Sequence, residues 1–369
     1  MKPSRIVVKL GTSTITAGSS KISYPGLLDL ARQVSALRQM GNEVILISSG
    51  AIAAGREILT QKNLSGQISA KQMLAAIGQS KLMGIYTQIF GMYDQLVGQV
   101  LLTKDDLLDR RRYLNARNTL NAMLAYEVIP IINENDTVAT EEIRFGDNDN
   151  LSALVANVLE ADLLILLTDQ DGLYTGDPRS DQNARMITEV SSEHIPEELW
   201  QAAGGSVSGL GTGGMFTKLS AADLARKSGV TVFIANGRTP DILLKIVKGE
   251  ATGTKFFPSN SKLESRKRYM LAGVQASTGI LYIDQGAEKA INKGGSLLPV
   301  GITRIAGEFE RGDIIRVRSA KLKEIAIGIT NYSFSDLEKI YGKNSGLIEE
   351  IIGYSYGDEV IHHNNMMLV

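Results

Sequence analysis

Residues 5–14, Arg5-Ile-Val-Val-Lys-Leu-Gly-Thr-Ser-Thr14, begin with a short apolar run typical of a buried β-strand and then break at a glycine. A helical periodicity follows over 27–40, and a second apolar run, Glu43–Ser48, ends in Ser49-Gly50. Strand, helix and strand at this spacing predict a βαβ unit, in which the two strands are parallel. Ligands of open parallel sheets bind beyond the carboxyl ends of the strands, so Gly11 and Ser49-Gly50 are expected at a binding edge.

Apolar runs and helical patterns continue to alternate as far as about residue 257. This alternation predicts a three-layer α/β/α sandwich with a mostly parallel open sheet over 1–258. A polar stretch without periodicity then predicts a linker at 259–272. Beyond it, short strand-like runs separated by turn signals predict a small, mostly β barrel over 273–369. The further strands are expected at 97–102, 128–133, 161–167 and 231–235, and in the tail at 279–284, 302–305, 313–318 and 324–329.

The composition of the 369 residues excludes several classes of chemistry. With 43% apolar residues, 21% charged residues and a net charge of -1, the chain is typical of a soluble globular protein without a general attraction to nucleic acid or anionic membranes. The absence of cysteine excludes disulfides and thiolate metal sites, and only three histidines are present. We assign no metal ligand to the protein. We expect a cytoplasmic location, because neither a signal peptide nor an apolar run of about 18 residues is found.

The glycine-rich stretch Ser206-Val-Ser-Gly-Leu-Gly-Thr-Gly-Gly-Met-Phe-Thr-Lys218 is predicted to bind phosphate through backbone N–H groups, helped by Thr212, Thr217 and Lys218. Its G-x-G-x-x-G spacing lacks the acidic residue about 20 positions on that a dinucleotide site needs. Because Lys218 follows Thr217 and precedes a leucine, a Walker A loop is also excluded. A flexible surface loop remains the alternative.

A lysine inside a buried strand is costly unless it is paired or used, so Lys9 is a candidate functional cation; a solvent-facing lysine on an edge strand is the alternative. A second signal lies between residues 133 and 150. One of its polar residues, Asp149 or Asn150, is expected to cap the following helix. Seven Asn and Asp residues in two clusters are more than capping needs and suggest recognition of an ammonium or carboxylate group. They are Asn133, Asn135, Asp136, Asp147, Asn148, Asp149 and Asn150.

The order of these motifs resembles the amino acid kinase family over about residues 5–257, and within it the enzymes that phosphorylate glutamate at the first step of proline synthesis. The tail is similar to a PUA domain, a module of RNA-binding type that bacterial members often carry. The motifs are Val7–Ser13, Ser48–Arg56, Ile132–Asp136, Gly146–Ala153, Leu167–Asp169, Gly172–Thr175, Asp177–Arg179 and Ser208–Met215 with Thr217-Lys218.

The resemblance implies a role for each matching residue. Lys9 and Lys218 would hold the transferring phosphoryl group and Asp149 would orient them. Ser49, Asp136 and Asn148 would bind glutamate, with Gly50 and Asn133 close by. The nucleotide would contact Lys9, Thr168, Asp169, Thr212, Gly213, Gly214, Met215, Phe216, Thr217 and Lys218. The family also implies ATP as phosphoryl donor, Mg²⁺ held mainly by ATP phosphates, proline as feedback inhibitor, and a homo-oligomer (dimer or tetramer).

The chemistry agrees with the scarcity of histidine. A carboxylate with a pKa near ~4.3 is already ionised at neutral pH, so its attack on ATP needs no general base. Asp136 is expected to pair with the α-ammonium, while Ser49 and Asn148 offer neutral donors to carboxylate oxygens.

Three alternatives stay open. The chain could be a kinase of the same family acting on acetylglutamate, aspartate, carbamate or a nucleotide. It could be an RNA-binding accessory protein, although residues 270–369 hold ten Lys/Arg against twelve Asp/Glu. The third alternative, a purely structural protein, would not explain why Lys9 lies in an apolar strand.

Overall fold

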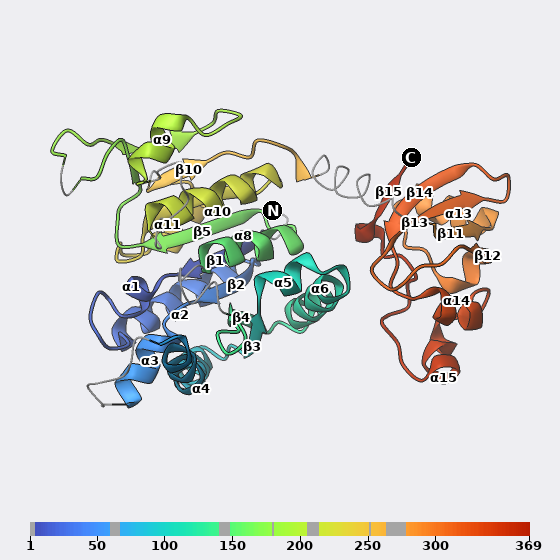
Figure 1. Cartoon of the computed structure of the whole chain (residues 1–369), viewed down its shortest axis with the longest axis horizontal. Coiled ribbons are helices and arrows are strands. Elements are labelled where there is room, and N and C mark those ends of the chain that lie inside the picture. The colour runs from blue at the N-terminus through green and yellow to red at the C-terminus, as the bar shows by residue number, and fades with distance from the viewer. Residues whose placement is uncertain are drawn as a thin grey trace. The chain divides into compact units, whose positions relative to one another are not determined.

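The computed structural model describes residues 4–59, 67–139, 148–178, 181–204, 214–250, 252–262 and 278–369 (Figure 1). Contacts divide the chain into two units. The first contains Met1–Leu108 and Ala116–Lys262, and the second contains Asp109–Asn115 and Leu263–Val369. Most of the predicted linker lies outside the described residues, so the boundaries at 258 and 273 stay predictions.

The first unit is built on an eight-stranded sheet (Figure 1). Strand β1 lies inside it and pairs in parallel with β2 on one side and β5 on the other, which confirms the predicted βαβ unit. Only β10 is antiparallel to its neighbour β9, so the mostly parallel sheet is confirmed. The order is β3 (Val97–Leu102), β4 (Ile129–Glu134), β2 (Glu43–Ser48), β1 (Arg5–Leu10), β5 (Leu163–Thr168), β9 (Thr231–Asn236), β10 (Thr254–Phe256) and β8 (Glu189–Val190).

Helices cover both faces of this sheet, which explains why its central strands are apolar throughout. Alternate residues of β1, Ile6, Val8 and Leu10, join a core with α2 (Tyr24–Gln39), α4 (Ile68–Gly91) and α11 (Ile242–Lys248). On the opposite face, α8 (Asn148–Val158) and α10 (Met215–Lys227) pack against each other and the sheet. The predicted three layers are thus confirmed. The remaining described elements of this unit are α1 (Thr12–Ile15), α3 (Ala51–Ile58), α5 (Lys104–Leu108), α9 (Glu197–Ala202), the part of α6 (Arg110–Ala125) from Ala116 onward, and a small hairpin of β6 (Leu173–Tyr174) with β7 (Met186–Ile187).

Helices α3 and α4 touch backbone to backbone at two glycines. A Cβ atom added to Gly55 would lie 2.0 Å from the carbonyl oxygen of Leu74, and one added to Gly78 would lie 1.8 Å from that of Ala51. Neither position has room for a side chain. This close approach fixes the start of α3, whose N-cap Gly50 adopts the left-handed φ of 92° that favours glycine.

Helix α8 begins at Asn148, so the predicted capping role of Asp149 or Asn150 is wrong. Both residues lie within the first turn of the helix. The side chain of Asp149 is used for tertiary contacts with two lysines instead.

The second unit contains a five-stranded sheet in the order β12 (Ile302–Ala306), β11 (Ile280–Ile283), β13 (Ile314–Ser319), β14 (Glu324–Ile329) and β15 (Met366–Leu368). The prediction of a mostly β tail is confirmed, and four strands lie within one or two residues of their expected positions. Among the described residues no pairing joins the edge strands β12 and β15. Residues 278–369 also form three short α-helices that the sequence did not predict, α13 (Gln285–Asn292), α14 (Phe334–Ile340) and α15 (Ile348–Ile352).

Across the described ranges, no helix has the length and apolarity needed to cross a bilayer.

Candidate active site

Lys9 lies near the carboxyl end of the internal strand β1 and is only 4% exposed. Its Nζ is 2.6 Å from Oδ1 of Asp149. The alternative of a solvent-facing lysine on an edge strand is therefore wrong. A buried ammonium is tolerated here because a buried carboxylate pairs with it.

Asp149 joins Lys9 to a second lysine. Lys218 Nζ lies 3.1 Å from Oδ2 of Asp149, and the Thr217 hydroxyl donates to the same oxygen at 2.7 Å. Burial alone would raise the pKa of Asp149, but the charges of Lys9 and Lys218 together with the hydrogen bonds lower it to about 2. The carboxylate is thus ionised at neutral pH and binds both ammonium groups. The group of three side chains carries a net charge of about +1.

A cavity of about 480 Å³ lies beside Lys218, beyond the carboxyl end of β5 and at the start of α10. Five predicted nucleotide contacts line it: Thr168, Asp169, Gly214, Met215 and Lys218. Thr212 and Gly213 lie outside the described residues. The other lining residues are Gly11, Ser13, Leu167, Gln170, Leu173, Tyr174, Gly176, Asp177, Pro178, Ala202, Ala203 and Gly204. We call this the nucleotide-side cavity.

Three described residues predicted to contact the nucleotide do not line this cavity, namely Lys9, Phe216 and Thr217. Lys9 pairs with Asp149 instead. Thr217 donates its hydroxyl to Asp149, and the ring of Phe216 packs edge-on against Trp200 of α9, with 5.5 Å between ring centroids. Both residues nevertheless lie in the first turn of α10, next to the lining residues Met215 and Lys218. Phe216 and Thr217 therefore lie beside the cavity without lining it, and their contact with a nucleotide stays a prediction.

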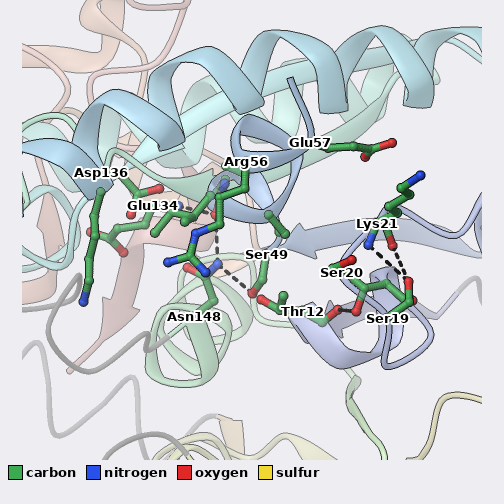
Figure 2. A pocket seen from close by; sticks show the side chains of 17 residues that line it. Thr12, Ser19, Ser20, Lys21, Ser49, Arg56, Glu57, Glu134, Asp136 and Asn148 are labelled. Atoms are coloured by element: carbon green, nitrogen blue, oxygen red, sulfur yellow. Dashed lines mark hydrogen bonds between the residues drawn. The ribbon is translucent and has the colours of Figure 1, made fainter. Parts of the chain in front are cut away.

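A larger cavity of about 680 Å³ is lined by all five residues predicted to bind the acceptor substrate (Figure 2). They are Ser49, Gly50, Asn133, Asp136 and Asn148. Strands β2 and β4 end here, together with the first residues of α3 and α8, as the parallel topology predicts. The remaining lining residues are Thr12, Thr16, Ser19, Ser20, Lys21, Ala51, Ile52, Ala53, Arg56, Glu57, Lys71 and Glu134. We call this the acceptor-side cavity.

Amide hydrogen bonds tie the acceptor-side residues together. Asn148 Nδ2 lies 2.8 Å from Asn133 Oδ1, 3.0 Å from Ser49 Oγ and 3.1 Å from the carbonyl oxygen of Ser48. The ends of β2 and β4 are thereby joined to the first turn of α8. Asn148 and Asp149 are consecutive, so this network also determines where the lysine-bound carboxylate lies.

The sequence did not single out the cations of the acceptor-side cavity, Arg56, Lys71 and Lys21. Figure 2 shows Arg56 extending from α3 over Asn148, whereas Glu57 points to the other side. Glu57 forms an ion pair with Lys81 at 3.1 Å. Arg56 was contained in the motif Ser48–Arg56, which is the one signal that could have identified it.

The two cavities share a wall. Gly11 lines the nucleotide-side cavity and the next residue, Thr12, lines the acceptor-side cavity. Likewise Asn148 lines the acceptor side, while Asp149 binds Lys218 of the nucleotide side. The group Lys9–Asp149–Lys218 therefore lies between the two cavities.

Comparison with known proteins agrees with this geometry. The Amino acid kinase family matches residues 4–236 and the PUA domain matches residues 279–352. A glutamate 5-kinase of Shewanella amazonensis is 53% identical over 99% of this chain and 96% of its own length. Those of Shewanella oneidensis and Vibrio campbellii are 53% and 49% identical, over 99% and 100% of this chain and 98% and 97% of their own lengths. The chain therefore belongs to the amino acid kinase family, within it to the glutamate 5-kinases, and carries a C-terminal PUA domain.

Proposed function

We propose that this kinase transfers the γ-phosphoryl group of ATP to the γ-carboxylate of L-glutamate, giving L-glutamyl 5-phosphate and ADP, the first step of proline biosynthesis. The observation that carries the proposal is a buried carboxylate, Asp149, that holds Lys9 and Lys218 between two cavities. One cavity is lined by acidic, amide and basic groups suited to an amino acid. The other is lined by Gly214, Met215 and Lys218, which belong to the described end of the glycine-rich stretch.

The reaction needs alignment and charge neutralisation more than proton transfer. An oxygen of the γ-carboxylate forms a bond to the γ-phosphorus while the bond from that phosphorus to the bridging oxygen breaks, and ADP leaves with the electron pair. No proton is moved, because the attacking carboxylate is already ionised. Lys9 and Lys218 stabilise the charge on the transferring group, and Asp149 keeps both ammonium groups in place.

The acceptor-side cavity carries charges of both signs. Arg56, Lys71 and Lys21 face it together with acidic residues, among them Glu134 and Asp136. Glutamate has two carboxylates and one ammonium group, so a cavity with both signs of charge can match all three groups. A desolvated polar site of this kind discriminates strongly against ligands that lack one of them.

ATP would occupy the nucleotide-side cavity with its phosphates toward Lys218 and the first turn of α10. Mg²⁺ is commonly held by substrate phosphates with one or two carboxylates and waters. Asp169 and Asp177 line this cavity and are the carboxylates of the described chain that fit such a role. The ion would supply further neutralisation of phosphate charge. Asp149 is not offered as a ligand, because two ammonium groups already engage its oxygens.

The direct test is ATP- and Mg²⁺-dependent turnover of L-glutamate, trapped by hydroxylamine as the γ-hydroxamate. Lys218→Ala should lower kcat by about 100- to 1,000-fold. Lys227→Ala on the same helix is the matched control. The side chain of Lys227 is 53% exposed and forms an ion pair with Asp223 at 2.5 Å, so this substitution should leave kcat unchanged. Wild-type protein that prefers aspartate or acetylglutamate, or a Lys218→Ala variant with normal kcat, would contradict the proposal.

Two finer features belong to the same proposal. Proline keeps the α-ammonium and α-carboxylate of glutamate, and we expect it to compete for the acceptor-side cavity. We also expect a homo-oligomer, to be measured by light scattering on the full chain. The PUA domain has no assigned ligand. An RNA titration across a salt series tests for nucleic-acid binding. Because residues 270–369 hold more Asp/Glu than Lys/Arg, we expect no salt-dependent binding of RNA.

A further inference from the structure

Three amide side chains form a buried hydrogen-bonded chain behind the acceptor-side cavity. Gln79 on α4 is 9% exposed, Asn133 at the end of β4 is 2% exposed and Asn148 at the start of α8 is 8% exposed. Asn133 Nδ2 donates to Gln79 Oε1 at 2.8 Å, and Asn148 Nδ2 donates to Asn133 Oδ1 at 2.8 Å. Gln79 itself does not line the cavity.

Backbone groups determine which way each amide faces. The backbone N–H of Glu134 donates to Asn133 Oδ1 at 2.9 Å, so this atom must be the oxygen. The nitrogen of Asn133 then faces Gln79 and requires an acceptor there. Asn148 Nδ2 faces the carbonyl oxygen of Ser48 at 3.1 Å, so this atom must be the nitrogen.

This orientation changes the expected contact between Asn148 and the substrate. Its two N–H groups already face three acceptors, on Ser48, Ser49 and Asn133, whereas no described residue donates to its Oδ1. Asn148 therefore offers an acceptor, suited to an ammonium group, rather than the donor expected from the sequence. Ser49 Oγ accepts from Asn148 and keeps its own O–H to donate to a carboxylate oxygen.

We propose that Gln79 is a positioning residue for substrate recognition: through Asn133 it holds Asn148 with Oδ1 toward the α-ammonium of the amino acid. This rests on the proposed function. Without the acceptor on Gln79, the nitrogen of Asn133 loses its partner and the amide can rotate. In the rotated amide, Nδ2 of Asn133 would face Nδ2 of Asn148, and Asn148 would lose one of the three acceptors that hold its direction.

The test compares Gln79→Met, which keeps an unbranched side chain but removes the acceptor, with Gln79→Glu, which keeps an acceptor. Gln33→Met is the matched control, because Gln33 is a buried glutamine of α2 whose Oε1 accepts from the backbone N–H of Leu243 at 2.9 Å. The measurements are kcat, KM for L-glutamate, and the inhibition constant of glutarate, which lacks the α-ammonium.

We expect Gln79→Met to raise KM for L-glutamate about 10-fold, the effect of one hydrogen bond to a charged group, with little change in kcat or in glutarate inhibition. Gln79→Glu should restore KM to near the wild-type value, and Gln33→Met should not alter it. An unchanged KM in Gln79→Met, or an equal loss of glutarate binding, would overturn the proposal.

A crystal structure of Gln79→Met separates this inference from the proposed function. If wild-type protein fails to phosphorylate glutamate, the proposed function fails, and the positioning role is decided by the geometry of the amides alone. A rotated Asn133 amide supports it. An Asn133 amide that keeps its contacts with Glu134 and Asn148 refutes it.

Discussion

Replacing Asp149 by asparagine would remove one charge and almost no volume from the centre of the site. The pKa of Asp149 falls from 3.8 to about 2 in the folded chain. At about 1.4 kcal/mol per pKa unit, this corresponds to roughly 2 kcal/mol of native-state stabilisation at neutral pH. The variant would also leave Lys9 buried beside Lys218 without a counter-ion, and removing one partner of a buried pair commonly costs about 3–5 kcal/mol. We expect Asp149→Asn to lose about 3 kcal/mol of unfolding free energy.

Urea unfolding followed by tryptophan fluorescence measures this loss. The chain has one tryptophan, Trp200, which lies in the first unit, so the signal reports on the unit that contains the site. Asp223→Asn on α10 is the control, because its partner Lys227 is 53% exposed and the pair is screened by solvent, and we expect a change below about 1 kcal/mol. In the hydroxamate assay, Asp149→Asn should reduce kcat by about 100-fold or more, while Asp223→Asn should not.

The pH dependence supplies a second check. Because the folded-state pKa of Asp149 is lowered, its stabilisation is complete above the unfolded value of 3.8 and is lost as the pH falls toward about 2. The stability difference between wild type and variant should thus be constant from about pH 7 to pH 5 and shrink only below pH 3.8. A difference under about 1 kcal/mol at pH 7, or one that already disappears by pH 5, would refute the reasoning.

Three further predictions concern the cavities. Gly50→Ala should cost about 1–2 kcal/mol in urea unfolding and raise KM for glutamate, because Gly50 has a φ of 92°. The control Gly84→Ala on α4, where a Cβ atom meets open space, should not destabilise the protein. Equal losses of unfolding free energy in the two variants would contradict the role given to the φ of Gly50. MgATP should change the fluorescence of Trp200, which packs on Phe216 beside the nucleotide-side cavity, whereas glutamate alone should not; an unchanged spectrum at saturating MgATP counts against that location. Proline should raise the apparent KM for glutamate at constant kcat, and a fall in kcat alone would place proline elsewhere.

The sequence was sufficient for the residues that follow buried strands. Ser49 and Asn133 lie at the ends of β2 and β4, and parallel pairing brings such positions together without further information. Lys9 could be identified because a charge inside an apolar strand has few explanations other than a buried pair. The position of Ser49 required only the strand period and the direction of the strands, whereas the family resemblance supplied the expected roles of Asn133 and Lys9.

The parts that were missed depend on packing between elements distant in sequence. Arg56 and Lys71 reach the cavity because α3 and α4 approach at Gly55 and Gly78, and nothing in a helical period specifies that contact. The start of α8 was misplaced because Asp149 resembles a cap in sequence, while its side chain is held by lysines from two other elements. The two-residue strands β6, β7 and β8 are too short to carry a periodic signal.

The wall shared by the two cavities has a thermodynamic consequence. Gly11 is the N-cap of α1 and Thr12 is its first residue, yet they line different cavities, so a displacement of this turn by a ligand in one cavity would be felt in the other. Linkage requires the effect to be reciprocal: the factor by which nucleotide changes the affinity for the amino acid equals the factor by which the amino acid changes the affinity for nucleotide. The binding affinities of the two substrates should therefore be coupled and not independent. The size of the coupling depends on how far the turn can move.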